Sequence, residues 1–330
     1  CTARDFLNMD YAAPGDHNPR GEDWERTVAA AEAFNEDDVF ATFFGWEDSS
    51  RQGHQNYYFV APDHPMICGG AAGVTGGGPN VNNKTLDRYA DFITIPHHTN
   101  AVAETRRIED DVPMWFSYPW TEPRESIRLV EVMQVRGMQE RNYGPDAWRG
   151  WHQGNFSSAQ DALERGHRLG FTGGTDNHVG WPGRAWDYNE AKIGANCAQK
   201  SVILTGAWTS RVERHAVFDA LRERHTWAVW DTRAIVWFTV NGRLMGDELA
   251  VRRGEKLTAQ LEISAEDALQ AVEVVSDGKS IWCASFVERD ISTSIDLGAA
   301  EGNAYFYVRA LQRNGGVIIA SPVFVIARPA

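Results

Sequence analysis

A carboxylate and an imidazole stand two residues apart behind a short apolar run in the middle of the chain. Residues 169–172 lead into two glycines and then to Asp176 and His178. At the end of a strand, residues i and i+2 point to the same side of the backbone. Such oxygen and nitrogen ligands suit zinc, manganese or iron. Taken alone, however, the pair is better explained as an Asx-turn with an incidental histidine.

Three further stretches place metal-binding residue types at the ends of predicted strands. They are Asp16-His17, Glu47 and His97-His98. In barrels and open parallel sheets, active sites form where the strands end. Packing alone would favour Val, Ile or Leu at these positions, because a buried unpaired charge is costly. The pattern therefore predicts a metal site, and His54, which begins a predicted strand, is a less secure member of it.

The elements that would hold these residues alternate between strand and helix up to about residue 230. The predicted strands cover 9–13, 39–47, 54–60, 93–98, 128–135, 169–172 and 201–207. The predicted helices cover 2–8, 24–34, 86–92, 157–169 and 211–224, with Ser157 or Ser158 as the cap of the fourth. This alternation is typical of α/β proteins with a parallel sheet or barrel.

The remainder of the chain has a different sequence pattern, in which short predicted strands follow one another without helices. They lie at 234–241, 255–263, 270–276, 280–286, 292–296, 304–312 and 317–326. Turn signals such as Asn241-Gly242 and Asp277-Gly278 separate them. Closely spaced short strands of this kind are typical of a small all-β sandwich. We therefore expect an α/β domain over 1–232 and a β-sandwich domain over 233–330.

The composition sets limits on partners. The chain has 330 residues, of which 43% are hydrophobic, and a formal net charge of −13. This charge argues against a general affinity for nucleic acid or anionic membranes, and no apolar run is long enough for a membrane span. The four cysteines lack metal-finger spacing. Because the sequence starts without Met or a signal-peptide pattern, we expect a missing N-terminus that would carry any targeting signal, so localisation stays open.

Several motifs resemble the PHP (polymerase and histidinol phosphatase) superfamily. They are Asp16-His17, Gly45-Trp-Glu47, Pro96-His97-His98 and Gly174-Thr-Asp-Asn-His178. The sequence looks most like a poorly characterised branch with a C-terminal β-sandwich, and Gly53-His54-x-Asn56 and Gly180-Trp-Pro-Gly183 add to that likeness. The resemblance covers nearly the whole chain. It implies a distorted (β/α)7 barrel that holds divalent metal ions (zinc, manganese or iron) and a metal-activated water.

The resemblance also implies roles for individual residues. His17, Asp176 and His178 would bind metal, and Glu47 would bridge two metal ions. One of His97 and His98 would be a ligand while the other supports it, and which is which stays open. We expect turnover to depend on Glu47 and Asp176. The residues that could support the ligands or contact the substrate are Asp16, His54, Glu131 and Arg184.

One part of the family pattern is absent. Members of the superfamily begin with a strand that carries His-x-His, and this sequence has none. Residues 2–17 match the helix and strand that normally follow it. We therefore expect a barrel that lacks its first strand and holds one to three metal ions. The unpaired strand edges beside the gap could lead to a homodimer.

Metal-dependent hydrolysis is the leading functional hypothesis. The resemblance favours a phosphoester or another small anionic substrate, which an arginine such as Arg184 could bind. A second hypothesis is a hydrolase of a carbohydrate-derived substrate, with loop tryptophans as stacking platforms: Trp115, Trp120, Trp148, Trp151 and Trp181. A third is a non-catalytic or impaired metal-binding protein. Retention of Glu47, Asp176 and His178 together argues against the third.

Overall fold

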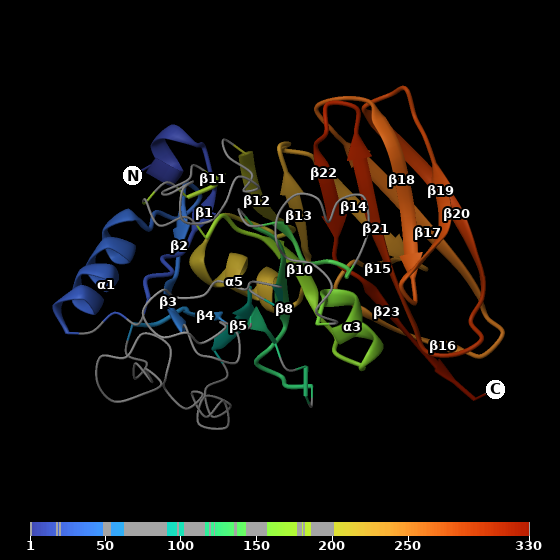
Figure 1. Cartoon of the computed structure of the whole chain (residues 1–330), viewed down its shortest axis with the longest axis horizontal. Helices are drawn as coiled ribbons and strands as arrows, with labels where there is room; N and C mark the ends of the chain where they lie inside the picture. Colours follow the sequence, from blue (N-terminus) through green and yellow to red (C-terminus); the bar gives the residue numbers. More distant parts are fainter. Residues whose placement is uncertain are drawn as a thin grey trace, which may run out of the picture.

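The computed structural model describes residues 2–17, 19, 21–48, 54–62, 91–97, 99–101, 116–118, 120–121, 123–134, 137–142, 157–176, 180, 182–185 and 201–329. Strands dominate these residues (Figure 1). The helices are the π-helix η1 (Thr2–Phe6), α1 (Glu22–Phe34), α3 (Ala159–Glu164) and α5 (Arg214–Arg222). Helices η1 and α1 lie at one end of the molecule, and the long strands of the C-terminal third lie at the other (Figure 1).

The strands before residue 174 form small sheets. β1 (Tyr11–Ala12) pairs in parallel with β2 (Ala41–Thr42), and β6 (Asn100–Ala101) pairs antiparallel with β7 (Phe116–Ser117). β3 (Phe44–Asp48), β4 (Gln55–Phe59) and β5 (Phe92–Pro96) form an antiparallel sheet in that order. β8 (Leu129–Gln134) lies between its parallel neighbour β10 (Gly170–Gly173) and its antiparallel neighbour β9 (Gly137–Met138).

The prediction of an α/β fold with a distorted (β/α)7 barrel is wrong. The part of the chain that the structure describes is mostly β-sheet, and most of its strand pairs are antiparallel. The connection from β3 to β4 shows the physical reason, because it covers only residues 49–54. A crossover between parallel strands needs about a dozen residues. The chain therefore turns back, and β4 pairs antiparallel with both of its neighbours.

The local helix predictions fare better than the architecture. Ser158 is the cap of α3, where its side chain accepts from Asp161 N–H and the Asp161 side chain accepts in return. α5 is where the alternation predicted a helix, yet the strands that it connects, β12 and β13, are antiparallel. Residues 86–90 of another predicted helix lie outside the described residues, and Phe92 begins β5.

The C-terminal strands form two layers. The larger sheet has nine strands: β11 (Arg184–Ala185), β12 (Ser201–Ala207), β13 (Thr226–Trp230), β22 (Val317–Ala320), β21 (Ala304–Gln312), β18 (Leu269–Ser276), β19 (Lys279–Ala284), β16 (Glu248–Arg252) and β23 (Val323–Arg328). The smaller sheet has four: β15 (Arg243–Leu244), β14 (Ile235–Val240), β17 (Lys256–Ser264) and β20 (Asp290–Ala299). β11, β13, β15 and β16 were not predicted from the sequence.

A common core joins the two layers. Along β17, buried Leu257, Ala259, Leu261 and Ile263 alternate with more exposed polar residues. Their side chains share one hydrophobic cluster with Val274 of β18 and other residues of the larger sheet. The period of two thus turns one face of the smaller sheet toward the larger one.

The nine-stranded sheet crosses the predicted boundary at residue 232. β13 precedes that boundary and pairs antiparallel with β22, from Trp227 opposite Ala320 to Trp230 opposite Val317. A second hydrophobic cluster likewise mixes residues from both sides, including Phe171 and Tyr307. The division into two domains stays a prediction, while the two halves share a sheet and a core. No helix among the described residues is long and apolar enough to cross a membrane.

Candidate metal centre

Three of the residues singled out by the sequence lie together at one end of the β3–β4–β5 sheet. Antiparallel pairing brings the end of β3, the start of β4 and the end of β5 to the same end of the sheet. Glu47 is the second-last residue of β3, His54 directly precedes β4, and His97 directly follows β5. The backbone N–H of His97 also donates to the His54 carbonyl at 3.1 Å.

His17, in the segment that follows β1, reaches the same place. It forms a parallel bridge with Glu47, and the Glu47 N–H donates to the Asp16 carbonyl at 2.9 Å. The carboxylate of Asp16 accepts instead from the Thr27 hydroxyl of α1, at 3.3 Å. The side chains of the adjacent residues Asp16 and His17 therefore differ in surroundings, since that of His17 lies against the Glu47 carboxylate and that of Asp16 faces α1.

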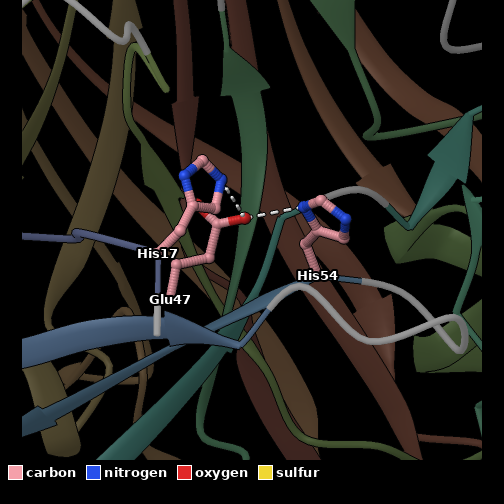
Figure 2. A group of neighbouring side chains, drawn as sticks. All are labelled: His17, Glu47 and His54. Carbon is pink, nitrogen blue, oxygen red and sulfur yellow. Dashed lines mark ion pairs between the residues drawn. The ribbon is translucent and has the colours of Figure 1, made fainter. Parts of the chain in front are cut away.

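Three imidazoles converge on a single oxygen of Glu47. Its Oε1 lies 3.2 Å from His17 Nε2, 2.6 Å from His54 Nδ1 and 3.3 Å from His97 Nε2. Figure 2 shows the rings of His17 and His54 on either side of this carboxylate. Glu47 and His97 are buried, at 4% and 1% exposure, whereas His17 is partly open to solvent.

Asp176 joins the cluster from the segment behind β10. Glu47, His97 and Asp176 offer ligand atoms within 4.8 Å of one another, as do His17, Glu47 and His54. Asp176 has φ of +47°, in the left-handed region that non-glycine residues rarely adopt. Strained backbone of this kind concentrates at functional sites.

The end of β10 is shaped around the carboxylate of Glu131. The register between β8 and β10 shifts between Thr172 and Gly173, which re-aims the chain that follows. A Cβ on Gly174 would lie 2.1 Å from Glu131 Oε2. Only glycine at this position leaves room for the buried carboxylate of Glu131.

The side chains of the cluster perturb one another's protonation. Burial disfavours the charged form of Glu47, but the three histidines hold the pKa of this carboxyl well below its usual value. Burial also acts to lower the pKa of His97, while the Glu47 carboxylate raises it to about 9. The hydrogen bond with Glu47 raises the pKa of His17. Burial raises the pKa of Glu131 to about 8.

The cluster faces a cleft of about 860 Å³. His17, Glu47, His97, Glu131 and Asp176 all line it. The neutral polar side chains in the lining include Asn56, Tyr58 and Thr175, and the apolar ones include Met9, Phe34, Pro182 and Leu204. Among the described lining residues, Arg26 is the one arginine or lysine. The carboxylates and imidazoles thus form a polar patch within a largely apolar cleft.

Some predicted site residues cannot be placed. His98 and His178 lie outside the described residues, and so do Trp115, Trp148, Trp151 and Trp181. The backbone of Arg184 belongs to β11, and its side chain lies outside the description. Trp120 is buried, and its Nε1 donates to the Ser157 carbonyl at 2.8 Å.

The sequence interpretation treated His54 as a less secure member of the site than the structure shows it to be. In the structure His54 makes the shortest of the three histidine contacts with Glu47. The signal was the spacing of the two residues: two apolar runs joined by a connection too short for a helix must form a hairpin. A hairpin places Glu47 and His54 at the same end of the sheet.

No protein-family model matches the chain, and a search of curated proteins finds no match either. The resemblance to the PHP superfamily therefore stays a prediction. The chemistry of the site rests on its geometry.

Proposed function

We propose that the chain is a metal-dependent hydrolase whose reaction centre lies at Glu47. The observation that supports this proposal is the convergence of three imidazoles on one buried carboxylate oxygen in an open cleft. Imidazole nitrogen and carboxylate oxygen are donors that suit zinc, manganese and iron. The donor set therefore fits a divalent metal ion.

The described residues offer two overlapping ligand groups. His17, Glu47 and His54 would hold one ion, and Glu47, His97 and Asp176 would hold another. A bound divalent ion lowers the pKa of a water molecule and polarises the scissile bond. His98 and His178 stay predicted ligands.

Several side chains of the cleft have roles of their own in this proposal. Glu47 is held ionised by its histidine neighbours, so it presents negative charge to a cation. In the metal-free chain, by contrast, burial raises the pKa of Glu131 to about 8, so there this carboxyl is largely protonated near neutral pH and can donate a hydrogen bond. The remainder of the described cleft lining is largely apolar.

A phosphoester is the substrate class that we propose. The sequence resemblance supports it, and a centre that holds two divalent ions would attract an anionic phosphoryl group. For a carbohydrate-derived substrate, stacking on tryptophan would be expected, and the described residues of the cleft lining include no tryptophan. That substrate class therefore ranks second.

The test compares Glu47→Gln with the unchanged chain. After loading with zinc, manganese or iron(II), hydrolysis of p-nitrophenyl phosphate is measured for both. We expect the substitution to lower the rate by at least about 100-fold, because it weakens a shared ligand. Glu262→Gln is the matched control, since Glu262 is an exposed residue of β17. An equal rate in Glu47→Gln and the control would overturn the proposal.

A further outcome separates catalysis from simple binding. If the chain binds metal through Glu47 but hydrolyses neither phosphoesters nor sugar esters, the hypothesis of a non-catalytic metal-binding protein replaces the hydrolase.

A further inference from the structure

Two buried glutamines lie directly behind the candidate metal centre. Gln134 is the last residue of β8, and Gln139 follows β9 in the same hairpin. Both are 0% exposed. Such a position costs free energy unless the amide groups are hydrogen-bonded. Their amide groups bond to the backbone around His97 and to Glu131.

Both amides donate to the carbonyl of His97. Gln134 Nε2 lies 2.8 Å from this oxygen, and Gln139 Nε2 donates to it as well. Gln134 Nε2 is also 3.2 Å from Glu131 Oε1. The amide of Gln134 thus ties the backbone of one cleft residue to the carboxylate of another.

Gln139 secures the chain on the far side of His97. Its Oε1 accepts from the backbone N–H of Thr99 and, at 3.3 Å, from that of Asn100. Its own backbone is fixed in turn, because its N–H donates to the Val132 carbonyl at 2.8 Å and its carbonyl accepts from Ala159 at 3.0 Å. The side chain therefore joins a rigid hairpin and the start of α3 to the segment that carries His97.

We infer that Gln134 and Gln139 are positioning residues that hold His97 and Glu131 in the geometry that binds a metal ion. The inference rests on the proposed function only in taking Glu47, His97 and Asp176 as a ligand group. Bonds from outer residues orient metal ligands, and their loss typically lowers metal affinity by about 10- to 100-fold. Neither glutamine is itself among the described residues that line the cleft.

The decisive experiment titrates the metal-free chain with Zn²⁺ or Mn²⁺ alone, by calorimetry, and follows Co²⁺ by its absorption spectrum. Gln139→Leu keeps the size of the side chain but removes both hydrogen-bonding groups. We expect about a 10- to 100-fold loss of affinity for one ion and an altered Co²⁺ spectrum. Gln139→Glu, which retains the acceptor but not the donor to His97, should also weaken binding.

The matched control is Gln312→Leu. Gln312 is equally buried, and its Oε1 accepts from the backbone of Glu266 and Asp267 in the C-terminal strands, at 3.0 and 2.9 Å. It should lower the thermal unfolding midpoint without changing metal affinity. If the variants of Gln139 do not fold, Gln134→Leu decides in their place.

The outcomes separate the two proposals. The positioning role is overturned if a folded Gln139→Leu or Gln134→Leu variant binds metal as tightly as Gln312→Leu does. A parent chain that binds no metal also overturns it. A parent chain that binds metal without hydrolysing any ester, while the glutamine variants bind more weakly, overturns the hydrolase and supports the positioning role.

Discussion

At the level of single residues, the site is a balance between burial and charge. Glu47 is buried yet ionised because three imidazoles surround its Oε1. Glu131 is buried without comparable compensation and has its pKa raised to about 8. Two carboxyl groups in one cleft therefore differ in protonation near neutral pH. Pairs of this kind are a common way to divide roles between acid and base.

The raised pKa values predict how the stability of the metal-free chain depends on pH. A group whose pKa is higher in the folded state favours folding below its unfolded pKa, and this contribution is lost as the pH rises through the folded value. For His97 the loss extends from about 6.5 to about 9, and for Glu131 it is complete by about 8. The thermal unfolding midpoint of the chelator-treated chain should thus fall as the pH rises from about 6 to about 9.

Metal ions should counter this fall. Binding requires a neutral His97, so metal affinity and the metal-induced rise in the unfolding midpoint increase with pH. Calorimetric scans with and without Zn²⁺ at each pH measure both effects. Glu131→Gln should flatten the metal-free curve, and a midpoint that rises steadily with pH in the absence of metal would contradict the assignment.

At the level of elements, hydrogen bonds from side chains add to the backbone pairing that holds the strands around the cleft. The end of β10 is fixed to β12 by Thr205, whose hydroxyl accepts from Gly173 N–H at 2.9 Å and donates to the Gly173 carbonyl at 2.8 Å. This pair of bonds lies three residues before Asp176. The position of Asp176 therefore depends on a strand that contributes no ligand itself.

Thr205→Val tests this dependence. Valine matches the shape of threonine but leaves the N–H and carbonyl of Gly173 without their partner, at a cost of about 1–3 kcal/mol. We expect lower stability in urea unfolding and weaker binding of the ion held by Glu47, His97 and Asp176. Thr239→Val in β14, remote from the cleft, should leave metal affinity unchanged. If Thr205→Val loses stability but not affinity, β12 has no part in placing Asp176.

At the level of the whole molecule, a buried ion pair connects the two halves of the chain. Arg309 of β21 donates from Nη1 to both oxygens of Glu140, at 2.7 and 3.0 Å, and its Nε donates to Glu273 at 2.8 Å. Tyr307 of the same strand donates its hydroxyl proton to Glu140. Glu140 belongs to the segment between β9 and α3, so the pair secures the nine-stranded sheet against the layer that carries the site.

Arg309→Met should be strongly destabilising. It removes the closer of two cations from the buried carboxylate of Glu140, which keeps only Arg141 Nε at 3.5 Å, at a cost of up to about 3–5 kcal/mol. Urea unfolding measures the loss, and the double variant Glu140→Gln/Arg309→Met should recover part of it. Arg289→Met is the control, because the exposed pair of Arg289 with Asp290 contributes little. A loss in Arg309→Met no greater than in the control would show that the halves do not depend on this pair.

Much of the local structure could be predicted from the sequence, whereas the architecture could not. The alternation of β17 and the serine cap of α3 depend on neighbouring residues, and both were readable. The directions of β4 and β13 depend on connection length and on distant partners, and periodicity says nothing about either. The parallel barrel was therefore predicted from partly correct elements, without β13, that were joined in the wrong way.

The candidate site was predictable to a similar degree. Glu47, His97 and Asp176 carry recognisable chemistry at strand ends, and the structure brings them together. The central place of His54 requires the hairpin to be known. Gln134 and Gln139 look like ordinary polar residues in the sequence, and only their burial and bonding partners distinguish them.

The place of β13 between β12 and β22 also limits how such a chain can change in evolution. A strand-rich tail attached by a linker can be exchanged between genes as a cassette. Here the tail supplies the hydrogen-bonding partner of β13, from Trp227 to Trp230, and removing it would uncover an edge beside the site. Gene fusions or deletions that replace the last hundred or so residues would therefore have to restore a strand at that position.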